Sequence, residues 1–213
     1  GGGVAGVNNT GSSLIDFHWR RAPGFFDVVA QNGTNDRVFE HNLGVPPEMI
    51  WLKSTSNEQE WVVYVESLGD GSMGFNQYAY NPGQSGWSAT DTTFTAAGGL
   101  ISPSKPYIAY LWASVPGICD IGTYTGNGAT QDIDCGFTNG ARFVLIKRTD
   151  GNGDWMHFDT LRGITSGSSP LLTLNTKAAE ASGSYIKPIS SGFTVTSNLT
   201  GISGAEYIYI AIA

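Results

Sequence analysis

One pattern occurs twice in this sequence, and that internal repeat constrains the fold more strongly than any local motif. Residues 15–33 reappear at a constant offset as residues 108–126, and both stretches carry the signature Trp-x3-Pro-Gly-x2-Asp. The signature begins at Trp19 in the first copy and at Trp112 in the second. We therefore expect two similar units related by a pseudo-twofold axis, with these tryptophans in equivalent places. The Pro-Gly pair is expected to join the last strand of one unit to the first strand of the next.

The composition is typical of an all-β protein with many tight turns. Charged residues make up 14% of the chain, whereas there are 29 glycines and 12% aromatic residues. Glycine supplies the positive φ angles of turns, and aromatic side chains suit a pleated surface. We predict two tandem, pseudo-symmetric antiparallel β-sandwich repeats of the jelly-roll type, either separate or merged into one large sandwich. The expected division is a Gly-rich linker at 1–13, a first repeat at 14–114 and a second at 115–213.

Short segments of strand character, separated by Asn, Asp, Gly and Ser, follow one another in both copies. The only helical candidate, residues 175–181, is too short to organise the fold. In the first copy we expect strands at 25–31, 37–43, 48–54, 60–68, 74–80, 87–95 and 106–114. In the second copy we expect them at 118–125, 131–137, 142–149, 154–160, 171–176, 192–197 and 206–213.

Alternation along one of these strands indicates which side chains share a face. Met49 and Trp51 point to one side and Ile50 and Leu52 to the other, so that both faces are apolar. The matching strand of the second copy has the same pattern, and both are therefore expected to be central strands covered on two sides. Each ends in a lysine, Lys53 and Lys147, for which we expect a solvated ammonium group, the alternative being a ligand contact.

Charge and hydropathy exclude two classes of partner. The net charge is −7, whereas nucleic-acid binding requires Lys and Arg residues clustered on one face. No run of eighteen apolar residues is present, so we expect no insertion into a membrane.

No arrangement of residues indicates catalysis. The three histidines, His18, His41 and His157, are scattered through the repeat, and no Gly-x-Ser-x-Gly nucleophile elbow occurs. We therefore expect a protein that is not an enzyme and needs no cofactor.

Oxygen-bearing side chains alternate in one turn, as they do at the start of a calcium-binding loop. They are Asp150, Asn152 and Asp154, but the sixth position is Trp155 instead of glycine and the twelfth is Leu161 instead of glutamate. A hairpin turn is the preferred interpretation, and a calcium site is the alternative.

The two cysteines leave two possibilities open. A hairpin centred on Asn127 places Cys119 opposite Cys135, within reach of a disulfide bond. Their counterparts in the first copy are Phe26 and His41, which are ordinary packing residues. We favour two reduced, buried thiols, because free cysteine behaves as a small apolar side chain.

The order of the segments FFDVV, NGTNDRVFEHNLGVPPEMIWLK, YIAYLWASVPGICDIGTYTGNG, DIDCGFTNGARFVLIKRTDGNGDW, GFTV and YIYIAIA resembles a known family. It is similar to the C-terminal twin-repeat region of tail-fibre-like virion structural proteins of tailed bacteriophages, notably marine and cyanobacterial ones. The resemblance covers the chain from Ser13 onward. It implies a non-enzymatic virion component of the tail, assembled in the host cytoplasm together with other tail proteins. It also implies a homo-oligomer, a trimer, because tailed-phage fibres resemble one another in being threefold.

Two functions of different classes remain. The first is a tail-fibre or tail-tip head domain that adheres to a host cell-surface polysaccharide through aromatic and amide side chains, because sugars stack on flat rings and are oriented by amides. The second is a purely structural module for assembly or for decoration of the capsid or tail. The candidate ligand-binding residues, which alternatively belong to the core, are Tyr78, Tyr80, Asn81, Gln84, Trp87 and Tyr107.

Overall fold

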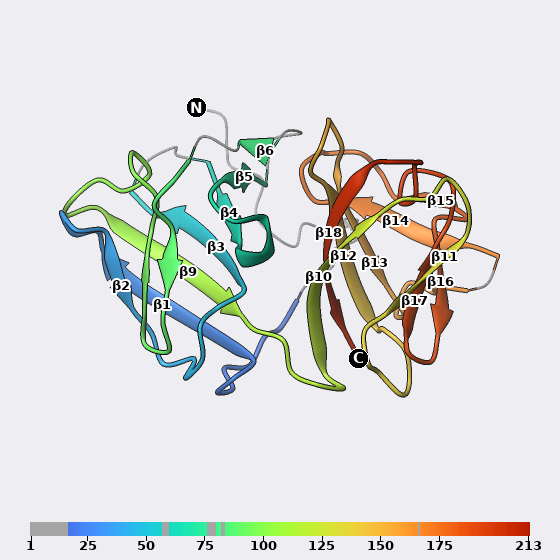
Figure 1. Ribbon diagram of the computed structural model, residues 1–213, viewed down its shortest axis with the longest axis horizontal. Coiled ribbons are helices and arrows are strands. Elements are labelled where there is room, and N and C mark those ends of the chain that lie inside the picture. Colours follow the sequence, from blue (N-terminus) through green and yellow to red (C-terminus); the bar gives the residue numbers. More distant parts are fainter. Residues whose placement is uncertain (1–16, 57–59, 76–79, 82–83, 166) are drawn as a thin grey trace, which may run out of the picture.

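The computed structural model describes residues 17–56, 60–75, 80–81, 84–165 and 167–213 (Figure 1). The expected linker at 1–13 lies outside these residues. Strands β1 to β9 form one half of the molecule and strands β10 to β18 form the other. The described residues contain no α-helix, and a single 3₁₀ turn, η1 (Glu66–Leu68), follows β4. The prediction of an all-β sandwich fold is confirmed.

The first half is built from a six-stranded and a three-stranded antiparallel sheet. The six-stranded sheet has the order β1 (Phe26–Asn32), β9 (Pro106–Trp112), β3 (Met49–Ser54), β4 (Val62–Val65), β5 (Ser72–Gly74) and β6 (Tyr80–Asn81). The three-stranded sheet has the order β2 (Val38–Glu40), β8 (Thr93–Thr95) and β7 (Ser88–Ala89). Apolar side chains of both sheets, among them Phe39, Leu52 and Phe94, share one buried cluster, which is the core of this half.

The second half repeats this plan strand by strand. Its six-stranded sheet has the order β10 (Cys119–Thr125), β18 (Glu206–Ile212), β12 (Phe143–Arg148), β13 (Trp155–Asp159), β14 (Ser169–Thr173) and β15 (Ala181–Gly183). Its three-stranded sheet has the order β11 (Gln131–Asp134), β17 (Gly192–Val195) and β16 (Ile186–Ile189). Phe158 and Phe193 belong to the buried cluster between them. Equivalent strands occupy equivalent places in both halves, as the sequence repeat requires.

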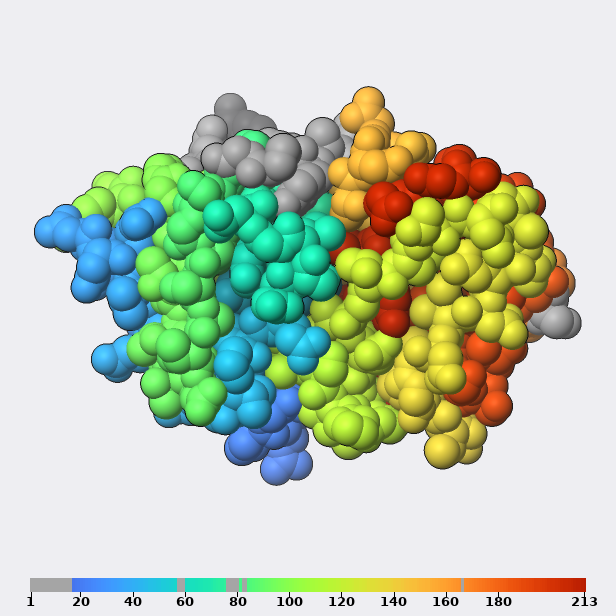
Figure 2. Space-filling model, in the orientation of Figure 1, coloured from blue at the N-terminus to red at the C-terminus, as the bar shows by residue number. Residues whose placement is uncertain are grey.

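A third buried cluster joins the halves, and we call it the central layer. It contains Met49 and Trp112 from the first six-stranded sheet and Leu145 and Ile208 from the second. The outer faces of the two large sheets therefore pack against each other, which gives four layers of sheet and three apolar layers between them. Figure 2 shows the halves in direct contact along the face that it presents.

Two hydrogen-bond links cross the central layer. The indole Nε1 of Trp155 donates to the carbonyl oxygen of Gly74 at 3.1 Å, from β13 to β5. The carboxylate of Glu48 accepts from the amide and the hydroxyl of Ser114, and that hydroxyl also accepts from the amide of Ile121 at 3.1 Å. Together with the apolar packing, these bonds hold the halves as one body.

The expected alternation along the central strands is confirmed. In β3 the side chain of Met49 lies in the central layer and that of Ile50 in the core of the first half. In β12 Leu145 and Val144 divide in the same way. Each strand is paired on both sides, so it is central within its sheet as well as covered on two faces.

The expectation of a solvated Lys147 is wrong. Its side chain is fully buried, and its Nζ donates to the carbonyl oxygen of Arg148 at 2.7 Å. Burial lowers the pKa of the Lys147 ammonium group to about 8, because the charged form loses solvation. Its partners across the sheet, Trp155 and Ile208, have side chains in the central layer, so Lys147 faces that layer, which a sequence pattern within one half does not reveal. Lys53, at the end of β3, is partly buried.

Trp19 and Trp112 are not in equivalent places, contrary to expectation. Trp112 belongs to β9, where it pairs with Phe26 and Met49, whereas Trp19 precedes β1 and lies in no strand. The counterpart of Trp112 is Ile212, the last residue of β18. The structural unit runs from β1 to β9, so Trp112 ends a unit whereas Trp19 stands before the first strand of one. Its ring instead packs edge-on against Trp112.

The Pro116-Gly117 turn connects β9 to β10 and thus joins the two halves, as predicted. Gly117 has a φ angle of 75°, in the left-handed region that favours glycine. The corresponding Gly24 has a φ angle of 74°. The repeated Pro-Gly pair therefore preserves one turn geometry in both copies.

The expected hairpin between the strands of the two cysteines is wrong. Strand β10 pairs with β18 in the large sheet, whereas β11 pairs with β17 in the small sheet. Cys119 lies in the central layer, Cys135 lies in the core of the second half, and neither is bonded to the other. Burial raises the pKa of both thiols, for Cys135 to about 12, which keeps them protonated.

Two further expectations on secondary structure are wrong. Residues 87–95 form two short strands, β7 and β8, because the Thr90 hydroxyl accepts from the amides of Thr92 and Thr93 and closes a turn between them. Residues 175–181 form no helix. There the Thr176 hydroxyl accepts from the amide of Ala178, an alternative to helical hydrogen bonding.

Candidate functional site

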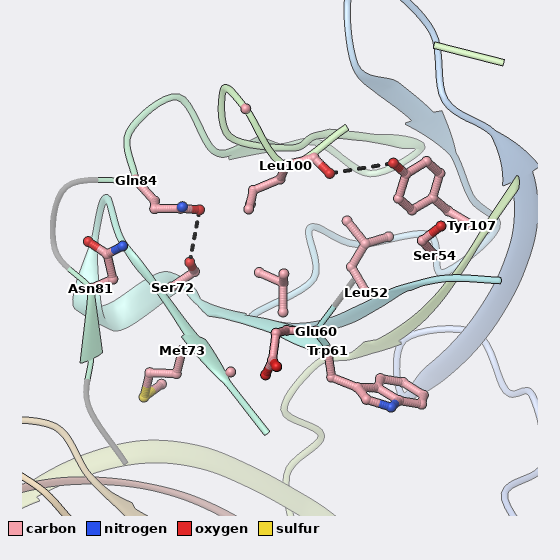
Figure 3. A pocket seen from close by; sticks show the side chains of 13 residues that line it. Leu52, Ser54, Glu60, Trp61, Ser72, Met73, Asn81, Gln84, Leu100 and Tyr107 are labelled. Carbon is pink, nitrogen blue, oxygen red and sulfur yellow. Dashed lines mark hydrogen bonds between the residues drawn. The ribbon is translucent and has the colours of Figure 1, made fainter. Parts of the chain in front are cut away.

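A cavity of about 220 Å³ opens at one end of the first half, between β4, β5 and the loop that follows β8 (Figure 3). It gathers three of the residues predicted from the sequence. Asn81 lies in β6, Gln84 lies in the connection that follows it, and Tyr107 lies at the start of β9. These residues come from separate segments, and the pairing of β5 with β6 brings the first two beside Ser72.

Polar groups line the cavity on the side of β5. The hydroxyl of Ser72 donates to Oε1 of Gln84 at 3.2 Å, and Figure 3 shows both groups beside Asn81. Among the described residues of the lining, Glu60 is the only charged one, and its side chain is exposed. The volume lies below the range of roughly 300–1,000 Å³ that is typical of ligand pockets, so the cavity suits one small polar molecule.

Tyr107 is buried, and its hydroxyl is engaged by the protein. It accepts from the amide of Ser102 at 2.9 Å and donates to the carbonyl oxygen of Leu100 at 3.5 Å. In the second half Tyr207 binds Ile202 and Leu199 in the same way. Because both copies keep this arrangement, the hydroxyl of Tyr107 holds a loop in place, and the ring forms a wall of the cavity.

Of the other three sequence candidates, Trp87 has a described side chain, and it does not line the cavity. Trp87 is buried in the core of the first half, where its ring stacks on Tyr64 with the centroids 4.8 Å apart. Tyr80 belongs to β6, but its side chain lies outside the description. Tyr78 lies outside the described residues altogether. The structure therefore brings together Asn81, Gln84 and Tyr107.

A second hollow of about 450 Å³ lies between the halves, and we call it the interhalf cleft. Its first wall consists of Trp51, Trp61 and Phe75 and its second wall of residues 174–177. The ring of Phe75 packs edge-on against both tryptophans, at centroid distances of 4.6 Å from Trp51 and 6.1 Å from Trp61. Sequence reasoning missed this cleft, because its two walls are about 100 residues apart in the chain and alternation assigns Trp51 to a core.

The second wall is fixed by hydrogen bonds of Asn175. Its Oδ1 accepts from the amide of Trp155 at 2.9 Å, and its Nδ2 donates to Oδ1 of Asp154 at 2.7 Å. Lys177 is exposed, and of the described residues that line the cleft it is the only charged one. The cleft therefore combines three aromatic rings with one cation on a fixed turn.

The turn considered for calcium does not bring its oxygen atoms together. Asp150 forms an ion pair with Arg148, with a shortest distance of 2.7 Å, and this hydrogen bond lowers the pKa of its carboxyl group. The carboxylate of Asp154 accepts from Asn175 instead, and Asn152 is exposed. Within the part of the chain that the structure describes, no three His, Cys, Asp or Glu residues are grouped to hold a metal ion.

His157 is fully buried and belongs to a structural network. Its Nδ1 lies 3.1 Å from a guanidinium nitrogen of Arg162, which also forms an ion pair with Asp159. Burial, followed by the charge of Arg162, lowers the pKa of His157 to about 4. The imidazole is therefore neutral at neutral pH and acts as a partner of Arg162.

Among the described residues, no helix has the length and apolar character needed to cross a membrane.

Comparisons place the chain in a family without describing its activity. No curated protein and no solved structure shows significant similarity to the chain. The model of the family described as "Domain of unknown function (DUF7483)" matches residues 2–213, and the chain therefore belongs to that family.

Proposed function

We propose that this chain is a non-enzymatic structural module of a tailed-phage virion, namely a tail-fibre or tail-tip head domain that contacts a glycan on the host surface. The observation that carries the proposal is the cavity in which Asn81, Gln84 and Glu60 come together. Amide and carboxylate groups hydrogen-bond to sugar hydroxyls, and a cavity of about 220 Å³ admits a single sugar ring.

The scaffold supports this role. The cavity lies at the end of strands whose sheet is buried on both faces, so its walls are held in place before a ligand arrives. Preorganised walls lower the entropic cost of binding. The resemblance to tail-fibre-like virion proteins adds to this reasoning. It also motivates our proposals of a homotrimer, of other tail proteins as partners and of a location in the virion tail.

Assembly or decoration of the capsid or tail is the competing candidate. Exposed apolar side chains favour it, since Leu161 is 95% exposed and Ile118 is 50% exposed. Such side chains occur singly on many surfaces, whereas the polar side chains of Asn81, Gln84 and Glu60 line one cavity. We therefore prefer glycan contact.

An array of bacterial surface polysaccharides, probed with the full chain, tests the proposal. We expect binding to at least one polysaccharide and a loss of about tenfold in affinity for Gln84→Ala, because a hydrogen-bonding group of the cavity is removed. Asn152→Ala is the matched control, since it removes an exposed amide outside the cavity. Binding to no polysaccharide, by protein that is folded, would favour the assembly role instead.

A further inference from the structure

The two copies of one tryptophan have different environments. Trp155 is buried in the central layer and donates its indole N–H to Gly74. Its twin in the sequence repeat, Trp61, is partly exposed and lines both the interhalf cleft and the cavity of the first half. The indole N–H of Trp61 donates to no group among the described residues. The fold therefore uses Trp155 for its own cohesion and leaves part of Trp61 at the surface.

The ring of Trp61 is nevertheless held in position. Its centroid lies 6.1 Å from that of Phe75 and 5.9 Å from that of Tyr110. Phe75 in turn contacts Trp155 at 4.6 Å, which ties this wall to the central layer. A partly exposed aromatic ring that is fixed by its neighbours offers a flat surface on which the C–H face of a sugar ring can stack.

The charge at the cleft selects the kind of sugar. Within the described part of its lining, Lys177 is the only charged residue, in a chain whose net charge is −7. The cavity of the first half has the opposite character, because Glu60 is the one charged residue among the described residues that line it. A ligand group that carries a carboxylate is therefore attracted to the cleft and repelled from the cavity.

We propose that the interhalf cleft binds an acidic pyranose, a hexuronic acid residue of a surface polysaccharide. The sugar ring stacks on Trp61, and its carboxylate forms an ion pair with the Nζ of Lys177. This inference rests on the proposed glycan contact and deepens it. It names a second subsite and the chemical class of the residue that occupies it.

Titration of the full chain with defined trisaccharides tests the inference. The probes are trimers of glucuronic, galacturonic and mannuronic acid and their neutral counterparts, in which each carboxyl group is reduced to an alcohol. We expect at least one acidic trimer to change the tryptophan fluorescence and to bind about fivefold or more tightly than its neutral counterpart, as one exposed ion pair allows. Added salt should reduce this preference.

Variants of two residues locate the binding, and Lys177→Gln assigns it to the cleft, because Lys177 lines the cleft and not the cavity whereas Trp61 lines both. Lys177→Gln should abolish the preference for the acidic trimer, and Trp61→Ala should lower the affinity for both trimers by about tenfold. Lys105→Gln is the matched control, because Lys105 is exposed and lies outside the cleft. Circular dichroism confirms that each variant is folded.

The outcomes separate the two proposals. Equal affinities for acidic and neutral trimers, or a preference that persists in Lys177→Gln, would overturn the acidic subsite. If the Gln84-dependent binding to a polysaccharide on the array survives that result, the glycan-contact function stands. If no acidic trimer, neutral trimer or polysaccharide binds, both proposals are wrong.

Discussion

Truncation of Ile146 to alanine should destabilise both halves together, although this side chain lies wholly within the second. Ile146 is fully buried in the core of the second half. Isoleucine-to-alanine changes in such cores cost about 2–5 kcal/mol, because apolar contacts are lost and a cavity remains. For a chain of this length, a loss of ~3 kcal/mol lowers the melting temperature by about 6–12 °C.

Tryptophan fluorescence mainly monitors the unfolding of the first half in this experiment. Of the six tryptophans, only Trp155 belongs to the second half. If the central layer couples the halves, fluorescence and far-ultraviolet circular dichroism will report one transition, shifted by the same amount in Ile146→Ala. Ile50→Ala is the matched control, since Ile50 is equally buried in the first-half core. A fluorescence transition that does not move, beside a second transition seen only by circular dichroism, would refute the coupling.

Two further predictions concern single side chains. Trp155→Phe should lower the free energy of unfolding by about 1–3 kcal/mol more than Trp112→Phe, as measured by denaturant titration. The indole N–H of Trp155 is hydrogen-bonded to the buried carbonyl of Gly74, which loses this donor in the variant, whereas the indole N–H of Trp112 has no hydrogen-bond partner to lose. Equal losses would contradict this. The pKa of His157 is lowered in the folded state to about 4, so the unfolded chain takes up the proton first as the pH falls. Stability should therefore decrease from about pH 6.5 to pH 4, by up to roughly 3 kcal/mol. His157→Gln should flatten this part of the pH profile, and an unchanged profile would show that other groups cause it.

Most strands of the large sheets could be predicted from the sequence because their signals are local. In β3 and β12, apolar residues on both faces indicate a covered central strand, and Asn, Asp and Gly mark where most strands end. Strands β15 and β16 were missed because they are short and contain Ser, Gly, Lys and Pro. Nothing in such segments distinguishes an edge strand from a loop.

Strand partners and the contact between halves could not be predicted in this way. The chain passes from the large sheet to the small sheet between β10 and β11, so two neighbouring strands that look like a hairpin belong to different layers. The sequence pattern predicts a solvated lysine at the end of β12, because the central layer that Lys147 faces forms only when the two halves pack together. The interhalf cleft could not be predicted either, because its two walls come from different halves. Three residues that line the cavity, Asn81, Gln84 and Tyr107, could be predicted from the sequence, because amide and aromatic side chains are the types that bind sugars.

The most direct test of glycan contact is saturation-transfer difference NMR on the full chain with purified bacterial surface polysaccharides. Irradiation of the aromatic protons of the protein saturates any sugar ring that stacks on them. We predict transfer to ring protons of at least one polysaccharide, and a marked loss of that transfer in Trp61→Ala. Spectra without transfer for every polysaccharide, from protein that circular dichroism shows to be folded, would contradict the account.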